Sequence, residues 1–347
     1  MSDLRVDVLT CDRPSRTLTP EEAAAEIAHI THHYTDPDRL AYTQPPVVAC
    51  DVRGSTTCIL DATQNSGRSF KAISMSNYPA QIEMPVIASA GNAALGLADA
   101  TLREGKSVAV FAPRTILDSK REALLQRPNV QLDTRGGTFE EALDLARWFA
   151  HTTEGATIMS GSGATAIAAL VKTLARNAVL TMQELQERNG IKEVTAALQL
   201  GAGSLATACC VAIREAVNTG VLRPNTSIVL GTSTVQDKSF FDGLNVVRQG
   251  PHATAIVNDG RYVDNRVKIS LTDAARAREI AAAAFPEYLP YGFEPTGLAG
   301  IATVLKDLER VDEPAERGYV CVLSGTNGSL EINKYLDNAL LGLVILD

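Results

Sequence analysis

A lone lysine, Lys71, is one candidate for covalent chemistry in this chain. It follows the polar turn NSGRSF (65–70) and stands at the start of a predicted helix. In such a position a lysine is commonly a solvated surface charge. In a partly apolar pocket, however, the amine loses its proton more readily and can form a Schiff base with an aldehyde. The segments around Lys71 therefore decide between a surface charge and a nucleophile.

Two glycine turns, each between a predicted strand and a predicted helix, are candidates for binding anions. The first, SAGNAA (89–94), begins a helix over 92–103, and the second, GAGSL (201–205), begins a helix over 205–218. The unpaired N–H groups at a helix N-terminus attract an anion, and glycine lets the backbone close on it. The second turn has an alternative interpretation, in which it binds no anion and is only a tight turn into a packed helix.

The same glycines also fit a dinucleotide site. GAGSLA (201–206) and GSGATA (161–166) both satisfy the G-x-G-x-x-A form of that fingerprint. A dinucleotide site needs an acid at the end of the next strand, and the strand over 227–230 has no acid after it before Asp237. The missing acid argues against a dinucleotide site, but the two glycine fingerprints keep an NAD(P)-dependent oxidoreductase as an alternative function.

The elements around these turns follow a regular order. From residue 83 onward, short β-rich runs alternate with longer helical ones, which predicts an α/β fold with mostly parallel sheets. At Gly136 and Gly137 a turn precedes Thr138 and Glu141 at capping-box spacing, so a helix must begin there. The other predicted strands are 84–89, 107–112, 130–133, 156–159, 195–200 and 319–323, and the other predicted helices are 20–30, 119–126, 165–176, 181–187, 273–284 and 298–308.

Length and composition indicate a globular protein of about two domains. The chain has 347 residues and a formal net charge of −8, which argues against a general binder of nucleic acid or anionic membranes. No stretch is apolar and long enough to span a bilayer, and the first residues do not resemble a signal peptide, so we expect a cytoplasmic protein. The scattered cysteines and histidines form no spacing typical of a metal site.

An ordered set of segments gives the chain a family resemblance over about residues 50–330. Together they resemble the pyridoxal-phosphate enzymes of the tryptophan-synthase-β-like class (fold type II), most closely threonine synthase and the serine/threonine dehydratases. The segments are SFK (69–71), SAGNAALGLA (89–98), GKSVAVFAP (105–113), GGTFEEALDLA (136–146), GAGSL (201–205) and LSGTN (323–327).

This resemblance implies pyridoxal 5'-phosphate as the cofactor and assigns roles to individual residues. Lys71 would be the Schiff-base lysine and the proton carrier at Cα. Asn92 would hydrogen-bond the phenolic oxygen of the cofactor, and Ser324 would face its ring nitrogen. The phosphate would be held by Gly201, Ala202, Gly203, Ser204 and Leu205, and the substrate carboxylate by Ser89, Ala90, Gly91, Asn92 and Ala93.

Two departures from the family pattern concern the substrate. Ala72 and Ile73 follow the lysine where the family usually has Asp-Arg, and Ala93 follows the loop asparagine where it usually has Thr or His. We therefore expect a lyase or synthase that acts on a small amino acid by β- (or γ-) elimination or replacement, with an altered substrate. A non-catalytic ligand-binding relative of the fold is a further alternative.

The order of the segments also predicts the domain organisation. We expect two three-layer αβα domains sharing a cleft, because the lysine segment precedes, and the phosphate loop follows, a self-contained run of strand and helix units. The resemblance alone implies a homodimer. The predicted parts are an N-terminal extension (1–50), a large cofactor-binding domain (51–77 and 158–347) and a smaller substrate-loop domain (78–157).

Overall fold

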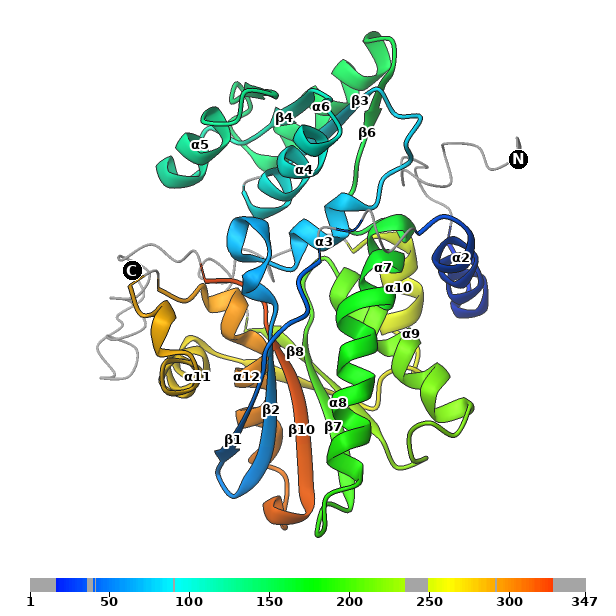
Figure 1. Ribbon diagram of the computed structural model, residues 1–347, viewed down its shortest axis with the longest axis vertical. Coiled ribbons are helices and arrows are strands. Elements are labelled where there is room, and N and C mark those ends of the chain that lie inside the picture. The colour runs from blue at the N-terminus through cyan, green and yellow to red at the C-terminus, as the bar shows by residue number, and fades with distance from the viewer. Residues whose placement is uncertain are drawn as a thin grey trace. The chain divides into compact units, whose positions relative to one another are not determined.

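The computed structural model describes residues 17–35, 40, 42–89, 91–234, 249–290 and 292–326, and these residues form two compact units (Figure 1). Unit 1 consists of the described parts of Met1–Thr43, Asn65–Lys172 and Gly250–His252. Unit 2 consists of the described parts of Gln44–Gln64, Thr173–Gln249 and Ala253–Asp347.

Unit 1 contains a four-stranded parallel sheet in the order β5-β4-β3-β6. Three helices follow its strands: α4 (Asn92–Arg103), α5 (Asp118–Leu125) and α6 (Phe139–Thr152). The crossovers through α4 and α5 lead to the neighbouring parallel strand, whereas the crossover through α6 passes from β5 to β6, which pairs with β3 at the other edge. The strands are β3 (Met84–Ala88), β4 (Val108–Phe111), β5 (Val130–Asp133) and β6 (Ala156–Ile158).

Alternate residues of this sheet face two different cores, which makes unit 1 a three-layer structure. Ile87, Val108 and Val110 pack with side chains of α4 and α5. Val86 and Ala109, from the opposite face of the same strands, pack with α6. Because successive side chains of a strand point to opposite faces, the apolar strands are buried on both sides.

The remaining elements of unit 1 surround the lysine segment. Helices α2 (Pro20–His33) and α3 (Lys71–Ser76) both pack against α7 (Ala164–Leu170). The start of α2 is fixed by a capping box, in which Thr19 accepts from the Glu22 N–H and the Glu22 carboxylate accepts from the Thr19 N–H. A short 3-10 turn, η3 (Ser66–Arg68), leads into α3.

Unit 2 contains a six-stranded sheet in the order β1-β2-β10-β7-β8-β9. Only the edge pair β1 and β2 is antiparallel, and the other neighbours are parallel. The carboxyl ends of β2, β10, β7 and β8 therefore lie along one edge. The strands are β1 (Val47–Val52), β2 (Ser55–Asp61), β7 (Glu193–Gln199), β8 (Ser227–Ser233), β9 (Asn265–Ile269) and β10 (Arg317–Leu323).

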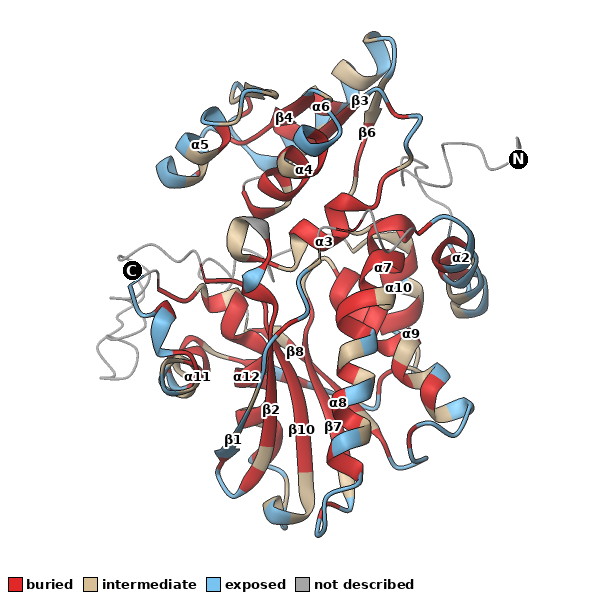
Figure 2. Cartoon of the chain, in the orientation of Figure 1, coloured by how far each residue is buried: buried red, intermediate tan, exposed pale blue. Residues whose placement is uncertain are grey.

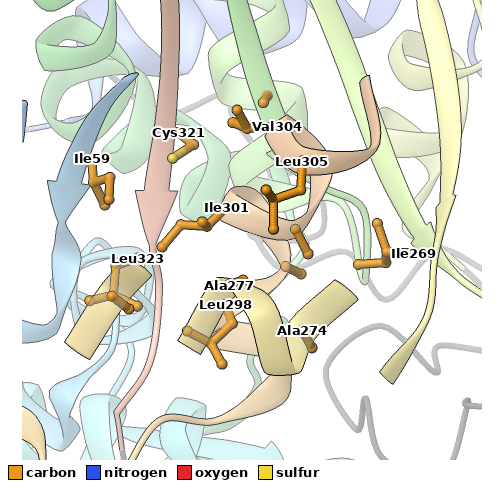
Figure 3. Close-up of a cluster of buried hydrophobic side chains, with 14 of the residues drawn as sticks. Ile59, Ile269, Ala274, Ala277, Leu298, Ile301, Val304, Leu305, Cys321 and Leu323 are labelled. Atoms are coloured by element: carbon orange, nitrogen blue, oxygen red, sulfur yellow. The ribbon is translucent and has the colours of Figure 1, made fainter. Parts of the chain in front are cut away.

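Helices cover both faces of this sheet, so its four central strands β2, β10, β7 and β8 are almost entirely buried, whereas the edge strands β1 and β9 are partly exposed (Figures 1 and 2). The helices α11 (Leu271–Ala284) and α12 (Pro295–Leu308) form one core with the sheet, shown in Figure 3. The helices α8 (Arg176–Gln186) and α9 (Ser204–Asn218) contact β7 on the other face. Shorter elements of the chain are η2 (Ala62–Gln64), η4 (Val171–Ala175), α10 (Pro251–Val257), η6 (Pro286–Tyr288) and η7 (Pro314–Glu316).

The fold class predicted from the sequence is confirmed: the protein is α/β, with two mostly parallel sheets. The β1–β2 hairpin was not predicted, because β1 begins inside the segment read as an N-terminal extension. The helices predicted over 165–176 and 181–187 are instead α7, the π-helical turn η4 and α8, which follow one another without a break. The domain boundaries predicted from chain order stay a prediction. Among the described helices, none is long and apolar enough to cross a membrane.

Candidate active site

Lys71 is the first residue of α3, and its backbone lies directly against α4. A Cβ added to Gly96 of α4 would lie 2.6 Å from the Cα of Ala72 and 3.2 Å from the carbonyl oxygen of Lys71. Glycine at position 96 is therefore what allows the two helices to meet at the lysine. The side chains of residues 72–76 are buried, whereas Lys71 itself is half-buried. An amine in such a position keeps access to a ligand while its backbone is held rigidly.

The predicted carboxylate loop begins where β3 ends, at the carboxyl edge of the unit 1 sheet. Ser89 is buried, and its Oγ accepts a hydrogen bond of 3.2 Å from the N–H of Gly91, the N-cap residue of α4. Asn92, also buried, is the first residue of this helix, and Ala93 is half-buried. Ala90 lies outside the described residues. Unit 1 thus places Ser89, Gly91 and Asn92 at the start of α4, and the backbone of Lys71 against Gly96, about one turn further along the same helix.

The predicted phosphate loop begins just after β7 in unit 2 and ends in α9. Gly203 is the N-cap residue of α9, with a left-handed φ of 95° that favours glycine. A Cβ at this position would lie 2.5 Å from the Cβ of Ala253. Gly201 and Ala202 are half-buried, whereas Ser204 and Leu205 are buried in the first turn of the helix. A side chain at Gly203 would therefore collide with Ala253 of α10.

The first turn of α9 fits a phosphate group. This 15-residue helix has no acidic residue in its first turn and no side-chain cap, so nothing of its own neutralises its N-terminal N–H groups. The hydroxyl of Thr207 is buried and has no hydrogen-bond partner in the described part of unit 2. It lies 3.8 Å from the position of a Cβ on Gly203. An anion bound here would accept hydrogen bonds from both the backbone N–H groups and this hydroxyl.

Ser324 follows β10, the strand that lies next to β7. It is buried, and its N–H donates a hydrogen bond of 3.2 Å to the carbonyl oxygen of Gly297 in α12. Thr326, two residues later, is fully buried, and its hydroxyl has no partner among the described residues. Both hydroxyls are therefore candidates to face a ring nitrogen, and Asn327 of the predicted segment lies outside the described residues.

Three polar residues at the same edge of unit 2 were not predicted from the sequence. A Cβ on Gly325 would lie 2.7 Å from Oε2 of Glu294, so this carboxylate borders the chain between Ser324 and Thr326. The amide of Gln199 ends β7 and is buried with no partner for either atom in the described chain. Gln199, and Asp61 at the end of β2, each follow an apolar run of a strand, and that pattern is the signal that could have found them.

Asp61 belongs to a buried polar network. Its carboxylate accepts hydrogen bonds from the N–H and hydroxyl of Thr63, from Gln64, and at 2.5 Å from the hydroxyl of Tyr288. Burial, together with the hydrogen bond to Asp61, raises the pKa of Tyr288 to about 12. Tyr288 therefore stays protonated, as a donor, throughout the physiological range. Asp61 is the register partner of Leu323, the residue before Ser324.

The fold and these two groups of residues define a class of protein: a fold type II pyridoxal-phosphate enzyme. The chain matches the family described as pyridoxal-phosphate dependent enzyme over residues 42–325. It therefore belongs to that family, and its cofactor is pyridoxal 5'-phosphate. The family match also favours this cofactor over a nicotinamide dinucleotide. No curated protein matches the chain in sequence.

Solved structures share the fold. The processed form of threonine deaminase isoform 2 from Solanum lycopersicum has a TM-score of 0.73 at 17% identity, covering 99% of this chain and 94% of that chain. Maize serine racemase has a TM-score of 0.66 at 16% identity, covering 93% and 99%. The O-acetylserine dependent cystathionine beta-synthase from Helicobacter pylori has a TM-score of 0.65 at 13% identity, covering 84% and 94%. These three proteins share one fold but are named for different reactions, so the likeness does not specify the reaction of this chain.

Proposed function

We propose that the protein is a lyase or synthase that acts on a small amino acid by β- (or γ-) elimination or replacement. The observation that carries this proposal is the buried, uncharged hydroxyl of Ser324, at the end of the strand next to the one that precedes the phosphate loop. In the proposed site it faces the ring nitrogen of the cofactor. A hydroxyl cannot stabilise a protonated ring as a carboxylate would, and this favours rapid loss of a leaving group over transamination.

The proposed roles of the unit 1 residues follow from their positions around α4. Bound pyridoxal phosphate supplies an electron sink that acidifies the Cα proton of an attached amino acid. Lys71 would hold the cofactor covalently, and its amine would carry the Cα proton of the substrate. The 89–93 loop holds the substrate carboxylate, and the Asn92 amide binds the phenolic oxygen. The half-buried amine at the rigid start of α3 supports this role for Lys71.

The proposed roles of the unit 2 residues are to hold and tune the cofactor. The N–H groups of residues 201–205 and the hydroxyl of Thr207 bind the phosphate. This assignment rests on the left-handed Gly203, the absence of an acid in the first turn of α9, and the Thr207 hydroxyl, which has no partner among the described residues. Since the phosphate anchors the cofactor, these contacts would hold the cofactor at the start of α9.

A two-part experiment tests the proposal. Borohydride reduction of the purified protein, followed by peptide mass spectrometry, is expected to find a pyridoxyl group on Lys71 and none in Lys71→Ala. The protein is then assayed with L-serine, L-threonine, O-acetyl-L-serine and O-phospho-L-serine, with detection of 2-oxo acids, replacement products and D-amino acids. Release of a 2-oxo acid or a replacement product supports the proposal.

Other outcomes identify the competing functions. Formation of D-amino acids without loss of the β substituent would replace the lyase proposal with a racemase. A pyridoxyl group on Lys71 together with no turnover of any of these compounds would instead support a ligand-binding relative of the fold. Family resemblance alone supports a homodimer, which sedimentation of the purified protein tests.

A further inference from the structure

Two histidines of α2, His29 and His33, are neighbours on the exposed surface of that helix. Residues four positions apart lie one turn above each other on the same face. The centroids of the two rings are 4.8 Å apart, the ring planes are tilted by 48°, and both side chains are exposed. No metal site was predicted from the sequence, because HITHH (29–33) lacks the glutamate of the zinc motif H-E-x-x-H, although it keeps the spacing of the two histidines.

The separation of the two rings fits a shared metal ion. A zinc–imidazole bond is about 2.0–2.1 Å long, so the centre of a bound ring lies about 3.2 Å from the ion. Two rings bound at an angle between about 90° and 110° then have their centroids about 4.5–5.2 Å apart. The separation of 4.8 Å lies within this range. The backbone of α2 therefore already holds the two rings at the spacing that chelation requires.

The charges of α2 favour a cation at this place. The helix contains three glutamates and no lysine or arginine. His33 is its last residue, and the carbonyl groups at the C-terminus of a helix carry partial negative charge, which stabilises a cation. A metal ion bound by the pair would therefore be attracted by the helix as well as by the two rings.

No third protein ligand completes the pair. Glu26, one turn before His29, is engaged by the buried His252 of α10, with Nε2 and Oε2 2.8 Å apart. Among the residues that the structure describes, no group of three or more His, Cys, Asp or Glu side chains could hold a metal ion. The ring of Tyr34, 5.6 Å from that of His29, flanks the pair. Because both histidines are exposed, water can fill the remaining positions around an ion.

We propose that His29 and His33 form a binding site for one divalent transition-metal ion, with water as the other ligands. Neutral imidazole suits Zn²⁺, Cu²⁺ and Ni²⁺, whereas Mg²⁺ and Ca²⁺ prefer oxygen ligands. The ion would link two successive turns of α2 and stabilise this helix, since it binds the folded pair better than the unfolded chain. None of the residues proposed to hold the cofactor belongs to α2, so the site does not depend on the proposed function.

The test measures Zn²⁺ binding to the untagged, cofactor-loaded protein by competition with a chromogenic chelator. The wild type is expected to bind one Zn²⁺ per chain at a site that His29→Gln and His33→Gln each weaken at least tenfold in Kd. The matched control is His32→Gln, an exposed histidine of the same helix outside the pair, which should change the Kd by less than twofold. Millimolar Mg²⁺ should not displace the bound Zn²⁺.

Three results would overturn the inference. The first is a wild type without a saturable Zn²⁺ site. The second is an unchanged Kd in either His29→Gln or His33→Gln, which would mean that the two rings do not share the ion. The third is an equal loss in His32→Gln, which would assign binding to the histidine-rich end of the helix rather than to chelation. The absorbance of the bound cofactor, expected to be the same in all four proteins, shows that each variant is folded.

Discussion

Gly96 of α4 and Ala72 of α3 are in backbone contact, one residue after the lysine that we propose binds the cofactor. A Cβ at position 96 would lie 2.6 Å from the Cα of Ala72, so one of the two helices would have to move. This contact fixes the start of α3 relative to the carboxylate loop, because α4 begins at Asn92. The geometry around Lys71 therefore depends on the absence of a side chain four residues into that helix.

Gly96→Ala is expected to lower both stability and cofactor occupancy. Inserting a methyl group into such a contact costs about 1–3 kcal/mol, and here the displaced atoms are backbone. Urea unfolding measures the free energy, and the absorbance ratio of cofactor to protein measures the occupancy. Gly260→Ala, at a position where a Cβ meets nothing within 4 Å, is the control. Full occupancy and unchanged stability in Gly96→Ala would show that the helices adapt.

Thr207→Val is expected to weaken cofactor binding without destabilising the empty protein. The Thr207 hydroxyl is buried with no partner in the described chain, so its removal costs no hydrogen bond in the absence of cofactor. A lost hydrogen bond to a charged phosphate is worth about 1.5–3 kcal/mol, or roughly 10- to 100-fold in Kd. Fluorescence titration with pyridoxal phosphate and urea unfolding report the two quantities.

The control for Thr207→Val is Thr303→Val in α12, whose hydroxyl donates to the Ala299 carbonyl oxygen. It should lose some stability and keep its cofactor affinity. If Thr207→Val binds pyridoxal phosphate as tightly as the wild type, the phosphate does not contact this hydroxyl.

How far the sequence predicted these features depends on the range of the interaction involved. Helix starts such as the one at Thr138 could be predicted because capping is a local interaction. The parallel strands could be predicted because short apolar runs alternate with helices along the chain. The hairpin of β1 and β2 is also local, but it was missed because β1 begins inside the segment read as an N-terminal extension. The pairing of β2 with β10 could not be predicted, because more than 250 residues separate the two strands and pairing over that distance leaves no periodic signal.

The same distinction between local and long-range interactions separates the site features that the sequence predicted from those that it did not. The glycine turns were found because a strand, a turn and a helix are consecutive in sequence. The approach of Lys120 to Gly91 and of Glu294 to Gly325 joins segments about 30 residues apart, and only the packing of helices onto the sheet brings them together. A polar residue that ends an apolar strand, as Gln199 and Asp61 do, was a readable signal that the sequence analysis did not use.

Ser324→Asp is expected to change the cofactor spectrum and the product ratio. A full negative charge at the ring nitrogen favours its protonated form, so transamination and racemisation should rise while elimination falls. Ser324→Ala should be milder, because it removes one hydrogen bond worth about 1–3 kcal/mol. Thr326→Asp is the matched comparison, since Thr326 is also buried. If only Thr326→Asp alters spectrum and products, Thr326 is the residue that faces the ring.

Tyr288→Phe is expected to lower stability at neutral pH and to have less effect in alkali. The change removes the donor at 2.5 Å from the Asp61 carboxylate, at a cost of about 1–3 kcal/mol. The pKa of Tyr288 is raised to about 12 in the folded protein, from an ordinary value of about 10. Its stabilisation is therefore fully present below about pH 10 and is lost as the pH rises toward 12.

Urea unfolding at intervals from pH 7 to 11 checks this dependence. The difference between wild type and Tyr288→Phe should narrow above pH 10, while Tyr34→Phe, at an exposed tyrosine, should show no difference at any pH. A constant difference across the whole range would mean that the phenol titrates alike in the folded and unfolded states.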